Sequence, residues 1–167
     1  MPQSILDRIR AFLSAAGISF REIHHEPTKT SEESARVRGE PLRVGGKALL
    51  MKGDQQFSLF VLPADRRVDS AAIRSELKIK KLRFATPEEL LELTEPIDGS
   101  GLVPGGVPPF GHPILPFDLY LDRGLQENDR IAFNAGSLTD SIILGMDDYL
   151  SVAKPRSIFA LSPVAND

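Results

Sequence analysis

The chain contains no cysteine among its 167 residues. This absence excludes disulfide bonds, thiolate nucleophiles and sulfur-ligated metal sites together. Histidine is scarce as well, since only His24, His25 and His112 occur and no HExxH spacing is present, so we expect no metal site. The sequence also lacks the G-x-S-x-G, Walker and dinucleotide-binding glycine motifs, which argues against the common serine-nucleophile and nucleotide-binding classes.

Long apolar runs and an excess of positive charge are also missing. No run approaches the roughly 18 apolar residues that a membrane span needs, and the first 17 residues interleave charged with apolar side chains, unlike a signal peptide. We therefore expect a cytoplasmic protein without membrane association. The net charge of −3 argues against broad electrostatic capture of nucleic acid, so no DNA partner is expected and any RNA contact must be small and shape-specific.

Capping residues and apolar periodicity predict a chain rich in short helices. The composition, 41% hydrophobic and 26% charged, is typical of a globular protein, and the length fits one domain over 1–167. Ser4 and Gly17 bracket the first predicted helix, and Thr86-Pro87 starts another with a capping box and a proline at the first helical position. The predicted helices cover 5–16, 30–39, 70–77, a segment from 87, and 147–153.

Apolar runs of strand length lie between these helices without a regular βαβ rhythm. The predicted strands cover 18–23, 48–51, 57–62, 82–85, 117–121, 130–133 and 141–144. Gly53-Asp54 forms a hairpin-type break between the second and third of them. The sequence therefore predicts an α+β fold in which helices surround a mixed, largely antiparallel sheet.

The segment 96–116 is unusually rich in glycine and proline. A long irregular segment inside a small domain is uncommon and is often functional. Gly105 and Gly106 offer unhindered backbone N–H groups, while Pro108 and Pro109 stiffen the path. Such a loop can present fixed donors to a carbonyl oxygen that becomes anionic in a tetrahedral transition state. The alternative is a plain surface connection.

Three other places carry side chains of interest. Lys47 follows two glycines at the start of an apolar run, so it either leans over a cleft or is a solvent-facing strand end. The run from Asn134 to Ser137 follows a strand and either lines a pocket that reads a hydroxyl or a ribose, or forms a turn. His25, at a strand end, either positions substrate or is structural.

Taken in order, these segments resemble the YbaK/prolyl-tRNA synthetase editing-domain family over nearly the whole chain. The resemblance is carried by His25-Glu26-Pro27, Arg38-Gly39, Gly46-Lys47-Ala48-Leu49, the loop from Gly105 to Phe110, and Ile131-Ala132-Phe133-Asn134-Ala135-Gly136. Within the family, Gly46-Lys47-Ala48-Leu49 and Ile131-Ala132-Phe133-Asn134-Ala135-Gly136 look most like the YeaK-type branch of free-standing enzymes. That resemblance implies trans-editing, the hydrolysis of seryl- and threonyl-tRNA esters.

The resemblance also implies a cleft for the aminoacyl-adenosine end of tRNA, with no cofactor and no metal. The family's characteristic lysine corresponds to Lys47, and its Gly-x-x-x-Pro loop to Gly105 through Pro109. The expected catalytic residues are Lys47, Gly105, Gly106 and Pro109, and the expected substrate-binding residues are His25, Pro108, Phe110, Asn134, Gly136 and Ser137. The expected partners are the aminoacyl-tRNA acceptor end and an aminoacyl-tRNA synthetase. The oligomeric state is left open.

Two departures from the family pattern bear on the substrate. Branches that act on alanyl-tRNA commonly carry Thr-Lys-Asn-Leu around the lysine and a late histidine, where this chain has Gly46-Lys47-Ala48-Leu49 and Asn134. Both departures argue against alanine. The alternatives are deacylation of alanyl- or cysteinyl-tRNA for proline, and a non-catalytic module that binds an aminoacyl-adenosine end or a synthetase surface.

Overall fold

The computed structural model describes residues 3–162, which form two β-sheets with helices packed around them. The helices are α1 (Ile5–Ala15), α2 (Ser31–Arg38), α3 (Ser70–Leu77), α4 (Pro87–Asp98) and α5 (Met146–Ala153), with 3-10 turns η1 (Leu42–Val44) and η2 (Arg123–Glu127). The strands are β1 (Arg21–His24), β2 (Gly46–Gly53), β3 (Gln56–Pro63), β4 (Leu82–Phe84), β5 (Asp118–Asp122), β6 (Arg130–Asn134), β7 (Asp140–Gly145) and β8 (Ser157–Phe159). Within this part of the chain, no helix has the length and apolar character needed to cross a bilayer.

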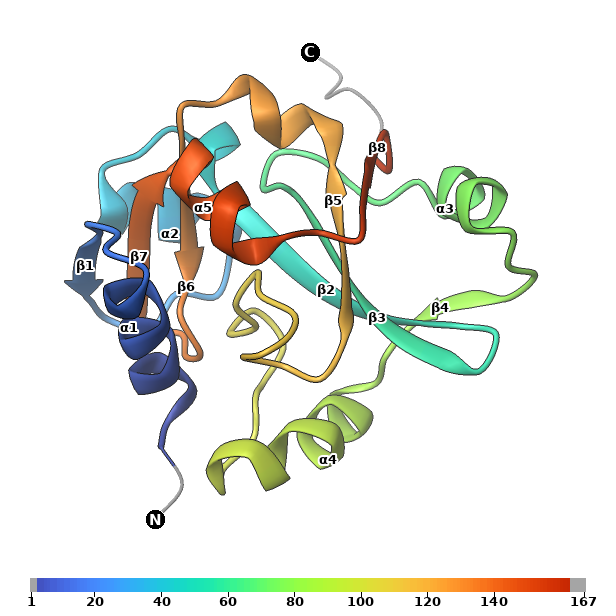
Figure 1. Cartoon of the computed structure of the whole chain (residues 1–167), viewed down its shortest axis with the longest axis horizontal. Helices are drawn as coiled ribbons and strands as arrows, with labels where there is room; N and C mark the ends of the chain where they lie inside the picture. Colours follow the sequence, from blue (N-terminus) through green and yellow to red (C-terminus); the bar gives the residue numbers. More distant parts are fainter. Residues whose placement is uncertain (1–2, 163–167) are drawn as a thin grey trace.

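The strands divide between a small antiparallel sheet, ordered β1-β7-β6, and a larger mixed sheet, ordered β4-β2-β3-β5-β8. In the larger sheet β3 pairs parallel with β5, and β5 pairs parallel with β8. Figure 1 shows the small sheet on the left, the long β2–β3 hairpin crossing the centre, and α3 and α4 towards the right and bottom. The predicted α+β class with mixed, largely antiparallel pairing is confirmed.

Helix starts follow the predicted capping chemistry closely. The Ser4 hydroxyl accepts from the Asp7 N–H, and the capping box between Thr86 and Glu89 is complete. At α2 the Thr30 hydroxyl accepts from the Glu33 N–H as expected, but the Glu33 carboxylate accepts from the N–H of residue 29 instead of closing the box. These side chains satisfy N–H groups that have no partner inside the helix.

The structure departs from the prediction most clearly at the start of the first strand, at the end of α4 and in one additional strand. The first strand begins at Arg21, because residues 18–20 stay outside the pairing of β1 with β7. Helix α4 continues through Pro96 to Asp98, since Leu93 and Ile97 pack against the core and outweigh the hydrogen bond that proline removes. Strand β8 was not predicted. It has only three residues, and its place depends on pairing with β5.

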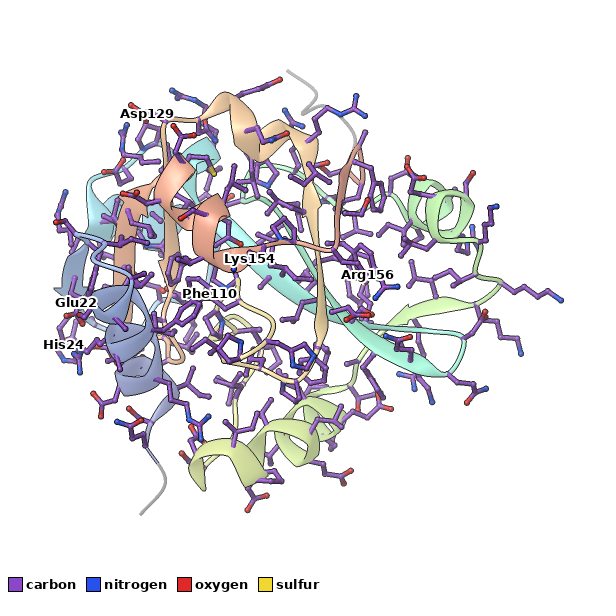
Figure 2. The ribbon with its side chains drawn as sticks, in the orientation of Figure 1. Glu22, His24, Phe110, Asp129, Lys154 and Arg156 are labelled. Carbon is purple, nitrogen blue, oxygen red and sulfur yellow. The ribbon has the colours of Figure 1, made fainter. Side chains whose placement is uncertain are left out.

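An aromatic cluster at the centre of the main core fixes one end of the glycine/proline segment. Phe110 is 1% exposed and makes edge contacts with Phe12 of α1, Phe133 of β6 and Tyr149 of α5, with ring centroids 5.5–6.0 Å apart. Figure 2 shows Phe110 in the interior of the molecule beside α1. Because aromatic pairs in this geometry add to the free energy of burial, the segment is held firmly at this residue.

The two sheets meet where β2 begins. Gly45 forms a parallel bridge with Ala132 of β6. A Cβ on Gly46 would lie 2.5 Å from Cδ1 and 2.9 Å from Cγ1 of Ile131, closer than side chains can pack. Only glycine allows this approach of the two backbones. The paired glycines before Lys47 therefore serve the contact between sheets.

We expect Gly46→Ala to lower the free energy of unfolding by about 1–3 kcal/mol, because the added methyl group overpacks the junction. Chemical denaturation of the variant and the parent measures this loss. Ile131→Val removes the Cδ1 atom that the methyl group meets, so the double variant should be less destabilised than the sum of the single variants. Strict additivity would contradict the contact.

Candidate functional site

A cavity of about 370 Å³ lies beside the junction of the two sheets. Its walls come from the segment before α2 and α2 itself, the start of β2, the loop at 104–107 and the end of β6. The lining residues are Thr28, Lys29, Thr30, Ser31, Ser34, Ala35, Arg38, Leu42, Gly45, Gly46, Lys47, Ala48, Leu49, Ala64, Pro104, Gly105, Val107, Asn134 and Leu138. Among these residues there are three cations and no carboxylate or imidazole, so the cavity is positively charged.

Lys47 contributes one of these cations from the second position of β2. The side chain is half-buried and makes no hydrogen bond or ion pair with residues 3–162. Burial lowers the pKa of the Lys47 ammonium, the nearby charge of Arg67 lowers it further, and the charges of Asp65 and Glu32 oppose this shift. The ammonium is thus available to a ligand.

Arg38, in the last turn of α2, contributes a second cation and is only 6% exposed. Its Nε donates to the Ser141 hydroxyl at 2.9 Å, and its Nη2 donates to the Asn134 side-chain carbonyl at 2.8 Å. Burial lowers the pKa of the Arg38 guanidinium to about 10, and the negative charge of Glu40 opposes this shift. The guanidinium therefore remains charged at neutral pH.

Asn134 connects Arg38 to the glycine/proline loop. While its carbonyl oxygen accepts from Arg38, its amide nitrogen donates to the Gly105 carbonyl at 2.7 Å. Both polar atoms of the side chain are engaged, so Asn134 holds the loop in place more than it offers free groups to a ligand. Asn134 is the last residue of β6, so its side chain contacts the loop from the end of that strand.

The loop presents a defined set of backbone donors. Pro108 and Pro109 have no N–H, and the Gly106 N–H donates to the Val103 carbonyl at 3.0 Å. The N–H groups of Gly105 and Val107 make no hydrogen bond within residues 3–162, and both residues line the cavity. The donors of the Gly-x-x-x-Pro segment that stay free are therefore these two.

Of the ten residues expected at the site, the structure places Lys47, Gly105 and Asn134 in the cavity wall. Gly106 lies just behind the wall, where its carbonyl accepts from the Gly136 N–H at 3.0 Å. The Pro109 carbonyl accepts from the Tyr149 hydroxyl at 2.6 Å. Pro108 and Phe110 are buried outside the lining. For Gly106, Pro108, Pro109 and Phe110 the structure shows contacts within the protein, and their roles towards substrate stay predictions.

His25 and Ser137 also lie outside the lining. The Ser137 hydroxyl donates to the Asp140 carboxylate at 2.7 Å. The His25 Nδ1 lies 2.8 Å from the Glu26 carbonyl, and its Nε2 lies 2.8 Å from the Ser141 hydroxyl. Since a carbonyl only accepts, Nδ1 carries a proton, and in the neutral ring Nε2 accepts from Ser141. His25 thereby supports the serine that contacts Arg38.

The residues missed from the sequence lie mainly on and before α2. Arg38 and Ser34 are four positions apart, which places them on one face of the helix, and the buried Ser34 and Thr28 hydroxyls are 2.7 Å apart. Arg38 sits in the Arg-Gly pair that contributed to the resemblance, but the many charges of this helix indicate a solvated face. Within residues 3–162, no cluster of three or more potential metal-ligating side chains is found.

A positively charged cavity with free backbone donors among residues 3–162 suits a ligand that carries phosphate or develops negative charge on an oxygen. The model of the aminoacyl-tRNA editing domain family matches residues 25–152. The chain therefore belongs to the aminoacyl-tRNA editing family, which confirms the resemblance and the predicted class of editing deacylase.

Individual proteins agree with this assignment. The chain is 39% identical over 157 residues to the multifunctional Ser/Thr-tRNA deacylase ProXp-y of Escherichia coli strain K12, covering 90% of this chain and 89% of that protein. It is 33% identical over 91 residues to the proline–tRNA ligase of Bacillus licheniformis, covering 54% of this chain and 15% of the ligase. The crystal structure of a candidate trans-editing enzyme for prolyl-tRNA synthetase matches with a TM-score of 0.80 and 24% identity, covering 98% of this chain and all of that one.

The charges around Lys47 predict how its ammonium titrates. Its pKa should lie below that of a fully exposed lysine, because burial disfavours the charged form. Arg67→Gln should raise this pKa by removing a repulsive charge, and Asp65→Asn should lower it by removing an attractive one. NMR titration of the lysine side-chain signals measures both directions. Shifts of the same sign in the two variants would contradict this arrangement.

Proposed function

We propose that this enzyme hydrolyses the ester bond of seryl- and threonyl-tRNA as a free-standing editing enzyme. The observation that carries the proposal is the half-buried, unpaired Lys47 ammonium in one cavity with the free N–H groups of Gly105 and Val107. The Ser/Thr-tRNA deacylase named above, with 39% identity over 90% of this chain, supports the choice of amino acids.

In the proposed reaction a water oxygen bonds to the ester carbonyl carbon, and the bond from that carbon to the ribose oxygen then breaks. The products are the free amino acid and a tRNA with its terminal hydroxyl restored. The N–H groups of Gly105 and Val107 stabilise the carbonyl oxygen as it becomes negative. The Lys47 ammonium binds the terminal phosphate or ribose and offsets the developing charge.

The cavity wall supplies no side chain that can act as a general base. No aspartate, glutamate or histidine is among the lining residues. A hydroxyl of the substrate's own ribose can position the water, and the ribose oxygen that leaves takes up the proton. Because the aminoacyl ester is already activated, orientation and charge stabilisation suffice, without a covalent intermediate.

The proposal extends to partners and location. The acceptor end of aminoacyl-tRNA is the ligand, and we place the reaction in the cytoplasm, where such esters are made. A synthetase that releases mischarged tRNA is the expected partner, since the relatives include prolyl-tRNA ligases. Alanyl- or cysteinyl-tRNA deacylation and a purely binding role are the alternatives that the following measurement separates.

Lys47→Ala should lower kcat/KM for seryl- and threonyl-tRNA by roughly 100-fold, the usual effect of removing one group that stabilises the transition state. Deacylation of radiolabelled seryl-, threonyl-, alanyl- and cysteinyl-tRNA measures this. Lys52→Ala is the matched control, since Lys52 lies on the same strand outside the cavity lining. Preference for alanyl or cysteinyl esters would contradict the proposed choice of amino acids. If the parent protein binds the tRNAs without hydrolysing them, the proposed enzymatic activity is wrong.

Gly105→Ala tests the loop. Gly105 has a φ of +87°, which side chains rarely adopt, and an added Cβ would lie 3.3 Å from Leu138. The loop should shift and misplace its N–H donors, so kcat should fall by roughly 100-fold while tRNA binding changes little. Ser100→Ala, at an exposed position earlier in the same segment, is the control. An unchanged kcat in the folded variant would show that the loop has no catalytic role.

A further inference from the structure

Arg38 carries a buried charge that no carboxylate pairs with. It makes no ion pair within residues 3–162, and its two hydrogen bonds go to the neutral oxygens of Ser141 and Asn134. Buried arginines are normally paired. Its Nη1 donates to none of these residues and is not shut off from the surface, so it opens to the cavity that Arg38 lines.

Nη1 lies close to Gly45, which also lines the cavity. It lies 3.6 Å from the place that a Cβ on Gly45 would occupy, beside the junction of the sheets. Lys47 is half-exposed and lies nearer to solvent. In the pose that we infer, the terminal phosphate lies near the more exposed Lys47, and the esterified amino acid, which ends the tRNA chain, extends towards the buried Arg38.

The loop and the Arg38 guanidinium lie close together on the cavity wall, on either side of the Asn134 amide. A single amide group, that of Asn134, spans the gap between the Gly105 carbonyl and the Arg38 guanidinium. In a seryl or threonyl ester, three bonds separate the carbonyl carbon from the side-chain hydroxyl oxygen. With the ester carbonyl at the loop, the hydroxyl would extend towards the Arg38 side of the same cavity.

We propose that Arg38 determines specificity by donating a hydrogen bond from Nη1 to the side-chain hydroxyl oxygen of the substrate amino acid. This inference rests on the proposed deacylase function. Among the hydroxyl-binding residues expected from the sequence, Ser137 and His25 lie outside the lining, and Asn134 already uses its carbonyl oxygen and one amide hydrogen in bonds to Arg38 and Gly105. An aliphatic side chain would leave Nη1 without an acceptor once water is displaced.

The test compares esters that differ only in the hydroxyl, seryl against alanyl and threonyl against valyl, each on the same tRNA. In the parent protein the hydroxyl-bearing member should have the higher kcat/KM. Arg38→Met should lower the seryl/alanyl and threonyl/valyl ratios by roughly 10- to 100-fold, the effect of one hydrogen bond from a charged donor. Arg38→Lys should also lower both ratios. An ammonium group cannot reproduce the planar guanidinium, which donates hydrogen bonds to Ser141, Asn134 and the ligand at once.

Arg36→Met provides the matched control, since Arg36 is exposed on the same helix and outside the cavity lining. It should leave both ratios unchanged. If Arg38→Met slows every ester equally, or Arg38→Lys restores the ratios, Arg38 acts through charge or structure and the specificity role is overturned. If the parent protein hydrolyses none of these esters, the proposed function itself fails.

A second measurement uses the unaltered protein and so does not depend on how the variants fold. Non-hydrolysable 3′-amide analogues of seryl- and alanyl-adenosine are added to protein labelled with ¹⁵N-arginine. The seryl analogue should bind roughly tenfold more tightly and shift the Arg38 side-chain signals, which Arg38→Lys assigns by their loss. Equal affinity of the two analogues, with no difference at Arg38, would overturn the proposal.

Discussion

The rest of the site depends on the close approach of β2 and β6. Gly45 bridges to Ala132, and Gly46 has no side chain at the place where the Ile131 side chain packs, so the two sheets come close enough to pair there. Lys47 comes next on β2 and Asn134 ends β6 two residues beyond Ala132. The junction therefore brings a cation from one sheet and an amide from the other to a single cavity. A side chain at Gly46 would separate them.

The charge of the cavity defines the chemistry available to it. The chain as a whole is slightly acidic, yet the lining holds Lys29, Arg38 and Lys47 and no carboxylate. In the proposed reaction such a site attracts phosphate and stabilises an oxyanion, while its lining within residues 3–162 offers no carboxylate or imidazole to take a proton from water. It suits a substrate that is already activated and brings its own hydroxyl groups, as an aminoacyl ester of ribose does.

The sequence predicted those features of the structure that depend on residues close together in the chain. Capping residues marked Ser4 and Thr86, and the pattern around Lys47 and Gly105 pointed to residues that do line the cavity. Long-range effects were not predictable. Arg38 lies in a helix whose other charges are solvated, and only the packing of α2 against β6 and β7 buries it. Strand β8 exists because β5 offers it a pairing edge.

The contacts of the Gly-x-x-x-Pro segment explain how both of its ends are held in place. At its start the Gly105 carbonyl is held by Asn134, and at its end the Pro109 carbonyl is held by Tyr149, with Phe110 packed in the aromatic cluster. The Val107 N–H lies between two fixed points and needs no rearrangement to meet a developing oxyanion. Preorganised donors of this kind stabilise a transition state more than mobile ones, so in the proposed mechanism these buried contacts contribute to the rate without touching substrate.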